Sequence, residues 1–481
     1  MSNYKTVFFT LGILLIILGV AMTVPVAIQL IYKEFDSTFI ISSIITITFG
    51  ILFFLSNIDH LKLINTQQAF LLTALSWLSI AIFGSLPFFF SELNLSITDS
   101  FFESMSGITT TGATILNNIE SSPKAILVWR SMLQWLGGIG VILMAITLMP
   151  IMNIGGMQLL KISSYDTSEK ILPKSREISL RLITVYISLT FLCAFFYKIF
   201  GMNFFDSLTH SMTTIATGGF SNYDQSIGYF NNPFIEITSI IFIVLGSIPF
   251  ILYIKFISDD KKIIFKDEQV KLFLKLTLVS ILILFFYLVI VNQNIFEIHL
   301  RSVIFNVVSI LTGTGYVTKE FDQWGNFPLI FFLILMFIGG CAGSTTCGIK
   351  IFRVHILYHF IRNQLLKIIY PRAVINLKYN YSKVEDKLIA SIISFIYLYI
   401  LIFFVLASLL TLTGLDFITS ISGAASSLSN VGPGLGGEIG PNSNYSGLPT
   451  VSKWLLSAGM ILGRLEIFAI LIIFLPSFWR K

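Results

Sequence analysis

The sequence predicts an all-α polytopic membrane protein. In the predicted fold, four pseudo-repeats of helix, pore loop and helix surround a central pore, and two extra transmembrane helices precede them. Hydrophobic residues make up 55% of the 481 residues and charged residues only 12%, a balance far outside that of soluble globular domains. Ten apolar runs alternate with four short segments rich in glycine and threonine.

The apolar runs set the number of expected membrane spans, because about 20 helical residues cross the hydrocarbon core of a bilayer. We expect ten spans, and the first two are the extra helices. The runs lie at roughly 6–31, 38–57, 68–90, 125–150, 178–200, 232–256, 270–292, 328–358, 386–412 and 451–476.

Four segments between the runs are too short to span a membrane, yet they are not polar loops. They read DSFFESMSGITTTGAT from Asp99, NFFDSLTHSMTTIATGGFS from Asn203, IHLRSVIFNVVSILTGTGYVT from Ile298 and DFITSISGAASSLSNVGPGLG from Asp416. Each has the pattern of a short helix ending in a small-residue turn, around Gly112, Gly218, Gly315 and Gly432. These glycines are 106, 97 and 117 residues apart, which indicates a fourfold repeat.

The repeat divides the chain into five predicted segments. Residues 1–62 hold the two N-terminal transmembrane helices. The four repeats, each with one pore loop, are residues 63–160, 161–265, 266–365 and 366–481.

The glycine and threonine of the short segments indicate ion contact. Irregular backbone at membrane depth is tolerated only where it is buried in protein or lines a water-filled cavity. A cation that sheds water needs a ring of carbonyl oxygens, which small residues allow the backbone to present. We expect Asp99, Asn203 and Asp416 to be helix N-caps, so that the negative C-terminal ends of the short helices point at the pore.

Charge is distributed unevenly between the two sides of the predicted bundle. The pore-loop side (91–123, 201–231, 292–325 and 413–450) carries eleven Asp and Glu against Arg301 and Lys319. By the positive-inside rule the pore loops face outward, where their acidic mouth concentrates cations. The net charge of +6 therefore reflects topology, and no nucleic-acid partner is expected. The basic residues of the opposite loops are Lys161, Lys170, Lys174, Arg176, Arg181, Lys255, Lys261, Lys262, Lys266, Lys271, Lys350, Arg353, Arg362, Lys367, Arg372, Lys378, Lys383 and Lys387.

The stretch GGCAGSTTCGIK from Gly339 interrupts the last helix of the third repeat with ten small residues, which a helix cannot accommodate without strain. It nearly matches the phosphate-binding pattern Gly-x4-Gly-Lys-Ser/Thr, but Ile349 separates Gly348 from Lys350 and no strand precedes it. We expect an intramembrane loop beneath the filter.

Arg464 lies about 13 residues into the last apolar run, roughly 20 Å from its outer end at 1.5 Å per residue. An intramembrane charge is costly and marks a functional site by default. An ion pair with Glu466 is disfavoured, because residues two apart on a helix point apart. We expect Arg464 to project into the pore and to form, with the 339–348 loop, a gate.

The loop motifs SGITTTGAT, MTTIATGGFS, GTGYVT and NVGPGLG resemble those of the Trk/Ktr/HKT superfamily of potassium transporters. The resemblance covers nearly the whole chain. The two leading spans, together with WRSMLQWLGGIG from Trp129 and GMILGRLEIF from Gly459, make the chain similar to the TrkH family within that superfamily.

The resemblance implies a potassium-binding filter and a gate, and a glycine instead of serine at Gly112 favours potassium over sodium. The implied filter residues are Thr110, Thr111, Gly112, Ala216, Thr217, Gly218, Gly313, Thr314, Gly315, Asn430, Val431 and Gly432. The implied gate residues are Arg464, Gly339, Gly340, Gly343, Ser344, Thr345, Thr346 and Gly348.

The resemblance also implies a homodimer in the bacterial cytoplasmic (inner) membrane, surrounded by lipid. A cytosolic nucleotide-binding subunit similar to TrkA would control opening. Potassium is then the substrate, and the chain itself binds no cofactor.

Two other classes of function are alternatives to a potassium channel. An ion-coupled secondary transporter, a sodium or proton symporter of another cation or small solute, would be built from inverted repeats, whereas these repeats run in one orientation. An enzyme is not expected, because the sequence has no Gly-x-Ser-x-Gly or His-Glu-x-x-His motif. The pair His355 and His359 has the spacing of two metal ligands but lacks a third.

Overall fold

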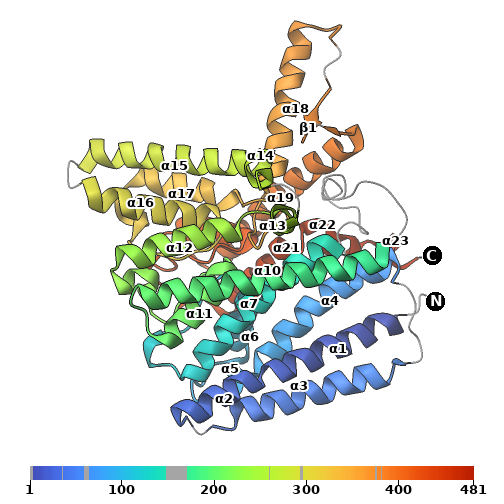
Figure 1. Cartoon of the computed structure of the whole chain (residues 1–481), viewed down its shortest axis with the longest axis vertical. Helices are drawn as coiled ribbons and strands as arrows, with labels where there is room; N and C mark the ends of the chain where they lie inside the picture. The colour runs from blue at the N-terminus through green and yellow to red at the C-terminus, as the bar shows by residue number, and fades with distance from the viewer. Residues whose placement is uncertain are drawn as a thin grey trace.

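Long apolar helices build most of the molecule (Figure 1). The computed structural model describes residues 4–34, 36–58, 64–147, 171–258, 261–292, 296–373, 376–380 and 382–480. The N-terminal helices α1 (Lys5–Ala21), α2 (Thr23–Tyr32) and α3 (Thr38–Leu55) form one side of the molecule, drawn in blue. They pack on one another and on α4 and α7, so they flank the centre of the bundle without entering it.

Four short central helices each lie between two longer ones. The helix triplets are α4 (Thr66–Gly84), α6 (Ile97–Ile108) and α7 (Lys124–Thr147); α10 (Ile171–Ile199), α11 (Phe204–Ile215) and α12 (Pro233–Gly246); α15 (Glu268–Asn292), α16 (Phe296–Leu311) and α17 (Asn326–Phe337); α19 (Asp386–Leu412), α20 (Phe417–Ser429) and α21 (Thr450–Arg464). In every triplet the central helix contacts both of its neighbours.

The triplets also contact one another in a closed order. The last helix of each triplet packs against the central helix of the next: α7 on α11, α12 on α16, α17 on α20, and α21 on α6. The fourth triplet thereby returns to the first, and the central helices surround one axis. The residue boundaries assigned to the five sequence segments stay a prediction.

Seven helical segments within the described ranges are long and apolar enough to cross a membrane, and two bent pairs raise the number to nine. The predicted spans 232–256 and 451–476 were expected to be continuous, and this was wrong. The first bends by 86° between α12 and α13 (Phe250–Ser258), and the second by 110° between α21 and α22 (Ile467–Leu471). Pro249, which has no N–H to continue a helix, lies at the first bend.

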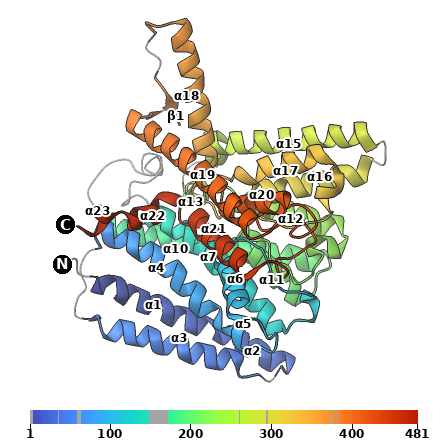
Figure 2. The ribbon, with the colours of Figure 1, turned by 180° about the vertical axis from the view of Figure 1, so that it is seen from behind.

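The eighth predicted span, 328–358, contains α17, an irregular loop and the start of α18 (Ile351–Ile369). Helix α18 projects away from the bundle in both views, next to a hairpin of β1 (Lys378–Tyr379) and β2 (Ser382–Lys383) (Figure 2). The antiparallel register pairs Lys378 with Lys383. The remaining short helices are α5 (Leu86–Phe90), α14 (Ile263–Lys266), α23 (Pro476–Trp479), η2 (Ile119–Ser121), η3 (Ser226–Phe230), η4 (Phe321–Trp324) and η5 (Ile472–Phe474).

Two of the three expected N-caps are confirmed. The side chains of Asn203 and Asp416 accept hydrogen bonds from the first-turn amides of α11 and α20. For α6 the expectation was wrong, because the cap is Ser96, whose side chain accepts a hydrogen bond from the Asp99 amide at 3.1 Å. Asp99 lies in the first turn and forms an ion pair with Lys453 at 2.6 Å.

The outer surfaces of the long helices are apolar. Exposed side chains such as Ile44, Phe191, Leu278 and Phe404 point away from the bundle, as expected where helices meet lipid tails. Conversely, the central helices carry many buried polar side chains, among them the serines and threonines of α6 and α20. The polar interior therefore lies at the axis, where the four central helices end.

Candidate functional site

The four central helices end in the same backbone turn. Thr110, Thr217, Gly313 and Asn430 all have a positive φ, of 52°, 49°, 71° and 52°. The amide of each bonds the carbonyl three residues earlier, and the following amide bonds the carbonyl five residues earlier, at 2.8–2.9 Å in all four turns. This pair of bonds defines a Schellman C-cap, which satisfies the last carbonyls of a helix and redirects the chain.

Two residues after each of these positions stands a glycine that also has a positive φ. The four glycines are Gly112, Gly219, Gly315 and Gly432, with φ of 86°, 77°, 78° and 106°. The second of them corrects the sequence prediction: the equivalent residue is Gly219, not Gly218. The second turn therefore consists of Thr217, Gly218 and Gly219, and Ala216 is the C-cap of α11. Two adjacent glycines had made the register ambiguous.

Each glycine lies against a carbonyl oxygen of the next turn. A Cβ atom on Gly112 would lie 2.2 Å from the Gly218 oxygen, and one on Gly219 would lie 1.9 Å from the Thr314 oxygen. The series continues from Gly315 to the Val431 oxygen at 1.9 Å, and from Gly432 back to the Thr111 oxygen at 2.6 Å. The four carbonyl oxygens of Thr111, Gly218, Thr314 and Val431 therefore form a closed ring, and any side chain at the glycines would break it.

The oxygens of this ring are largely unpaired. All four residues lie in the interior. Within the described part of the chain, the Thr111, Thr314 and Val431 oxygens accept no hydrogen bond, while the Gly218 oxygen accepts one from Gln134 Nε2 at 2.6 Å. A buried carbonyl normally has a hydrogen-bond partner. Three unpaired carbonyls on one axis thus form a cradle for a positively charged group.

On one side of the ring the four glycines line a hollow, together with Arg130, Asp224 and Tyr445. Arg130 is buried and forms an ion pair with the buried Glu103 of α6 at 2.7 Å. Its guanidinium also donates to the Ser221 carbonyl at 2.9 Å, so the pair ties the segment after the second turn to α6. No signal in the sequence indicated that Arg130 and Glu103 are partners.

On the other side the intramembrane loop closes the axis. Thr217 Oγ1 donates to Thr345 Oγ1 at 3.2 Å, and Thr110 Oγ1 lies 3.8 Å from Cys347 Sγ. A Cβ on Gly313 would come within 3.9 Å of the Cys347 amide. The predicted position of this loop, directly under the four turns, agrees with these contacts.

The loop is held by backbone bonds into the bend between α12 and α13. The amides of Cys341 and Thr345 donate to the Ser247 and Gly246 carbonyls at 3.2 and 3.3 Å, and Phe250 donates to the Gly343 carbonyl at 2.9 Å. The free backbone N–H and C=O groups at the break in that span and in the irregular loop thus form hydrogen bonds with each other, as burial in a membrane requires.

The loop also packs tightly on itself. Gly339 has no room for a side chain, because its Cβ would lie 1.7 Å from the Cys347 oxygen. Gly343 and Gly348 have a positive φ. Ser344 and Thr346 form a hydroxyl pair at 2.7 Å, and Lys350 donates to the Thr346 carbonyl.

Arg464 is buried directly beside this loop. Its guanidinium donates to the Thr345 carbonyl at 3.1 Å, to Cys347 Sγ and to the Gly137 carbonyl of α7 at 3.2 Å. The expectation that Arg464 lies within a continuous helix was wrong, since it is the last residue of α21 and the chain turns sharply after it. The guanidinium of Arg464 therefore lies at the end of α21, next to the loop and to α7, and not in the middle of a straight helix.

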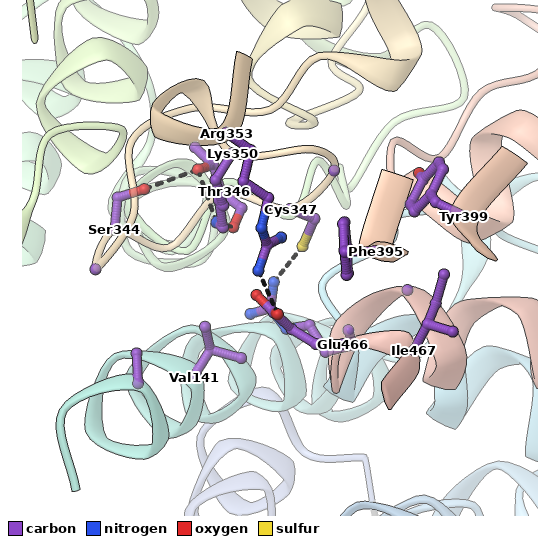
Figure 3. Close-up of a pocket in the computed structure, with 15 residues that line it drawn as sticks. Val141, Ser344, Thr346, Cys347, Lys350, Arg353, Phe395, Tyr399, Glu466 and Ile467 are labelled. Atoms are coloured by element: carbon purple, nitrogen blue, oxygen red, sulfur yellow. Dashed lines mark hydrogen bonds and ion pairs between the residues drawn. The ribbon is translucent and has the colours of Figure 1, made fainter. Parts of the chain in front are cut away.

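Glu466 forms an ion pair with Arg353 of α18, and both side chains are buried (Figure 3). The guanidinium of Arg353 lies over the ring of Phe395, 3.8 Å from its centroid. Glu466 has a φ of 61°, a strained backbone for a residue with a side chain. The sequence showed a carboxylate inside an apolar run, but its partner lies 113 residues away.

Arg464, Arg353, Glu466 and most of the predicted gate residues line one cavity on the far side of the loop from the glycine-lined hollow. Figure 3 shows Ser344, Thr346 and Lys350 on one wall of this cavity and Glu466 and Ile467 on another. Among the residues that the structure describes, no group of three or more metal-ligating side chains occurs. His355 and His359 have their Nε2 atoms 3.1 Å apart.

The fold defines a polytopic, all-α integral membrane protein in which four short central helices end around one axis. Comparison with known proteins identifies the group more closely. Residues 36–481 match the TrkH family, described as cation transport proteins, and the chain belongs to that family.

Similar proteins cover its whole length. The chain is 38% identical to the Trk system potassium uptake protein TrkI of Halomonas elongata, over 100% of this chain and 98% of the relative. It is 34% identical to the Trk system potassium uptake protein TrkH of Escherichia coli, over 100% of both chains. The crystal structure of the potassium transporter TrkH from Vibrio parahaemolyticus superposes with a TM-score of 0.92 at 33% identity, covering 99% of this chain and 100% of that one.

Proposed function

We propose that the chain takes up potassium through a channel-like pore whose filter is the ring of carbonyl oxygens at Thr111, Gly218, Thr314 and Val431. The observation that carries this proposal is the ring itself: each of its oxygens lies against the glycine of a neighbouring turn, and three of them have no hydrogen-bond partner among the described residues. A dehydrated cation supplies the missing partner for all of them at once.

The four central helices support the same charge preference. Each ends at the ring, so that its negative C-terminal end points at the axis. Potassium, rather than another cation, is favoured by the relatives, which are named as potassium uptake proteins.

The intramembrane loop and Arg464 form the gate in this proposal. The loop occupies the axis under the turns through Thr345 and Cys347, and the buried guanidinium puts a positive charge beside the same path. A cation that leaves the filter inward meets a steric barrier and an electrostatic barrier together. Opening therefore requires the loop to leave the Arg464 guanidinium.

The protein acts in this account as a homodimer in the bacterial cytoplasmic membrane, with the glycine-lined hollow outward. A cytosolic nucleotide-binding subunit controls the gate. Helix α18 follows the loop directly and projects away from the bundle, so a partner that moves α18 would pull on the loop.

Cation flux into liposomes that contain only this protein tests the proposal. We expect potassium flux to exceed sodium flux, and to rise when the cytosolic subunit and its nucleotide are added. Flux that required a proton or sodium gradient would instead favour a symporter. Equal flux of both cations, or none with the subunit present, would overturn the proposed filter.

A further inference from the structure

We propose that Gln134 of α7 is a positioning residue that sets the ion selectivity of the second corner of the filter. This inference rests on the proposed function, since it concerns the carbonyl ring described above. Gln134 is fully buried. Its side chain forms a hydrogen bond to the filter carbonyl of Gly218, whereas no described side chain does so at the other three corners.

The Gln134 amide group holds the second turn at two points. Nε2 donates to the Gly218 carbonyl at 2.6 Å, and Oε1 accepts from the Phe220 amide at 3.1 Å. The side-chain amide of Gln134 thus donates to the residue before Gly219 and accepts from the residue after it. The direction of the Gly218 carbonyl is therefore fixed by a side chain from outside the turn.

The space for this side chain exists because the second turn has glycine at position 218. A Cβ atom there would lie 2.4 Å from Gln134 Cδ. The equivalent residues of the first and third turns are Thr111 and Thr314, whose hydroxyls pair with Thr109 and Thr312 at 2.8 Å each. In those two turns a local pair of threonine hydroxyls stabilises the backbone. In the second turn the hydrogen bonds of Gln134 have this role.

The consequence for ion binding follows from the chemistry of the carbonyl. An oxygen that accepts a strong hydrogen bond shares its lone pairs with the donor and is held in one direction. Such a corner cannot tilt inward to contact a smaller ion. Gln134 thus stiffens the one turn that has neither a threonine pair nor a bulky side chain, and opposes collapse of the ring around sodium.

The test compares Gln134→Met, which keeps the side-chain length but forms neither bond, with the wild-type protein in liposomes. Of the two hydrogen bonds lost, only the one to the Gly218 carbonyl acts on a filter oxygen. We therefore expect the ratio of potassium to sodium flux to fall about three- to tenfold, the range that one buried hydrogen bond supports. Potassium flux itself should persist. Ser131→Ala on the same buried helix is the matched control, because the one partner of the Ser131 hydroxyl among the described residues is the Leu127 carbonyl of its own helix.

A flux ratio in Gln134→Met equal to that of Ser131→Ala would overturn the inference. If the wild-type protein still preferred potassium, that result would leave the proposed filter standing. If the wild-type protein showed no preference, the proposed filter and the inference about Gln134 would both fail. Should the methionine variant not fold, Gln134→Glu at alkaline pH replaces it, since a carboxylate cannot donate to the Gly218 carbonyl. The same fall is expected, and an unchanged ratio there contradicts the inference equally.

Discussion

The two layers along the axis are held in different ways. In the carbonyl ring, turn geometry is set by backbone bonds that recur four times, and the turns contact one another through glycines. In the layer beneath, backbone bonds tie the loop to the bend between α12 and α13, and three buried basic residues, Lys350, Arg353 and Arg464, add side-chain contacts. The ring has approximate fourfold symmetry, whereas the lower layer has none.

From this difference we expect the carbonyl ring to be rigid and the layer beneath it to move. A backbone turn closed by neighbouring backbone cannot change shape without losing several bonds at once. Side-chain contacts such as those of Arg464 can be exchanged one at a time, as switching elements require. The ring is therefore suited to selection, and the layer beneath it to gating.

The largest expected effect comes from breaking the ring. Gly315→Ser places a side chain in a left-handed conformation, which costs about 1 kcal/mol or more, and drives its Cβ into the Val431 carbonyl. We expect potassium preference over sodium in liposome flux to fall at least about tenfold. Gly437→Ala, at a glycine with open space around it, is the control and should leave the ratio unchanged. Intact selectivity in Gly315→Ser would show that this layer does not select.

The second effect concerns the charge beneath the ring. Arg464→Ala removes a buried positive charge from the path, and we expect potassium flux without the cytosolic subunit to rise roughly tenfold, equivalent to about 1.4 kcal/mol of barrier. The ion preference should not change, because the ring is untouched. Arg181→Ala, at an exposed arginine paired with Glu177, controls for the loss of one cationic side chain. Flux at the control level would remove Arg464 from the gate.

A smaller effect is expected from loosening the loop itself. In Gly339→Ala the new methyl group would meet the Cys347 oxygen, so the contact between these two parts of the loop must open. We expect a rise of about threefold in unregulated potassium flux, which is less than for Arg464→Ala because the charge remains. Gly140→Ala on α7, where a methyl group would meet only Trp77 at 3.8 Å, should leave the flux at its original level.

The smallest effect on flux is expected at the ion pair between Arg353 and Glu466. Arg353→Gln and Glu466→Gln should each lower the Tm of the purified protein, because each removes one charge of a buried ion pair. A double-mutant cycle should give a coupling of about 1–3 kcal/mol, with flux changed by no more than about twofold. Additive losses would mean that the two residues do not stabilise each other.

Much of the fold could be predicted from the sequence, because membrane burial leaves few options for apolar runs. The lengths of the apolar runs predicted the long helices, and the recurring glycines predicted the four short central helices. The bends could not be predicted from composition. Pro249 is a local signal for the first of them, but the contacts that hold this bend, such as Cys341 with Ser247, join distant segments.

The candidate site could be predicted where the backbone has a positive φ that favours glycine, as at Gly112, Gly315 and Gly432. It was not predictable where two residues of one type are adjacent, and the choice between Gly218 and Gly219 needed the backbone angles. Partnerships across the fold were also invisible. Glu103 with Arg130, and Arg353 with Glu466, join residues 27 and 113 positions apart.

The central claim is that a potassium ion takes the place of the missing hydrogen-bond partners in the ring. The most direct test is a crystal structure of the protein grown with Rb⁺ in place of K⁺, with anomalous scattering used to locate the ion. We expect an anomalous peak on the axis, contacted by the carbonyl oxygens of Thr111, Gly218, Thr314 and Val431, and weaker after exchange into Na⁺. An anomalous peak elsewhere with none inside the ring would contradict the account.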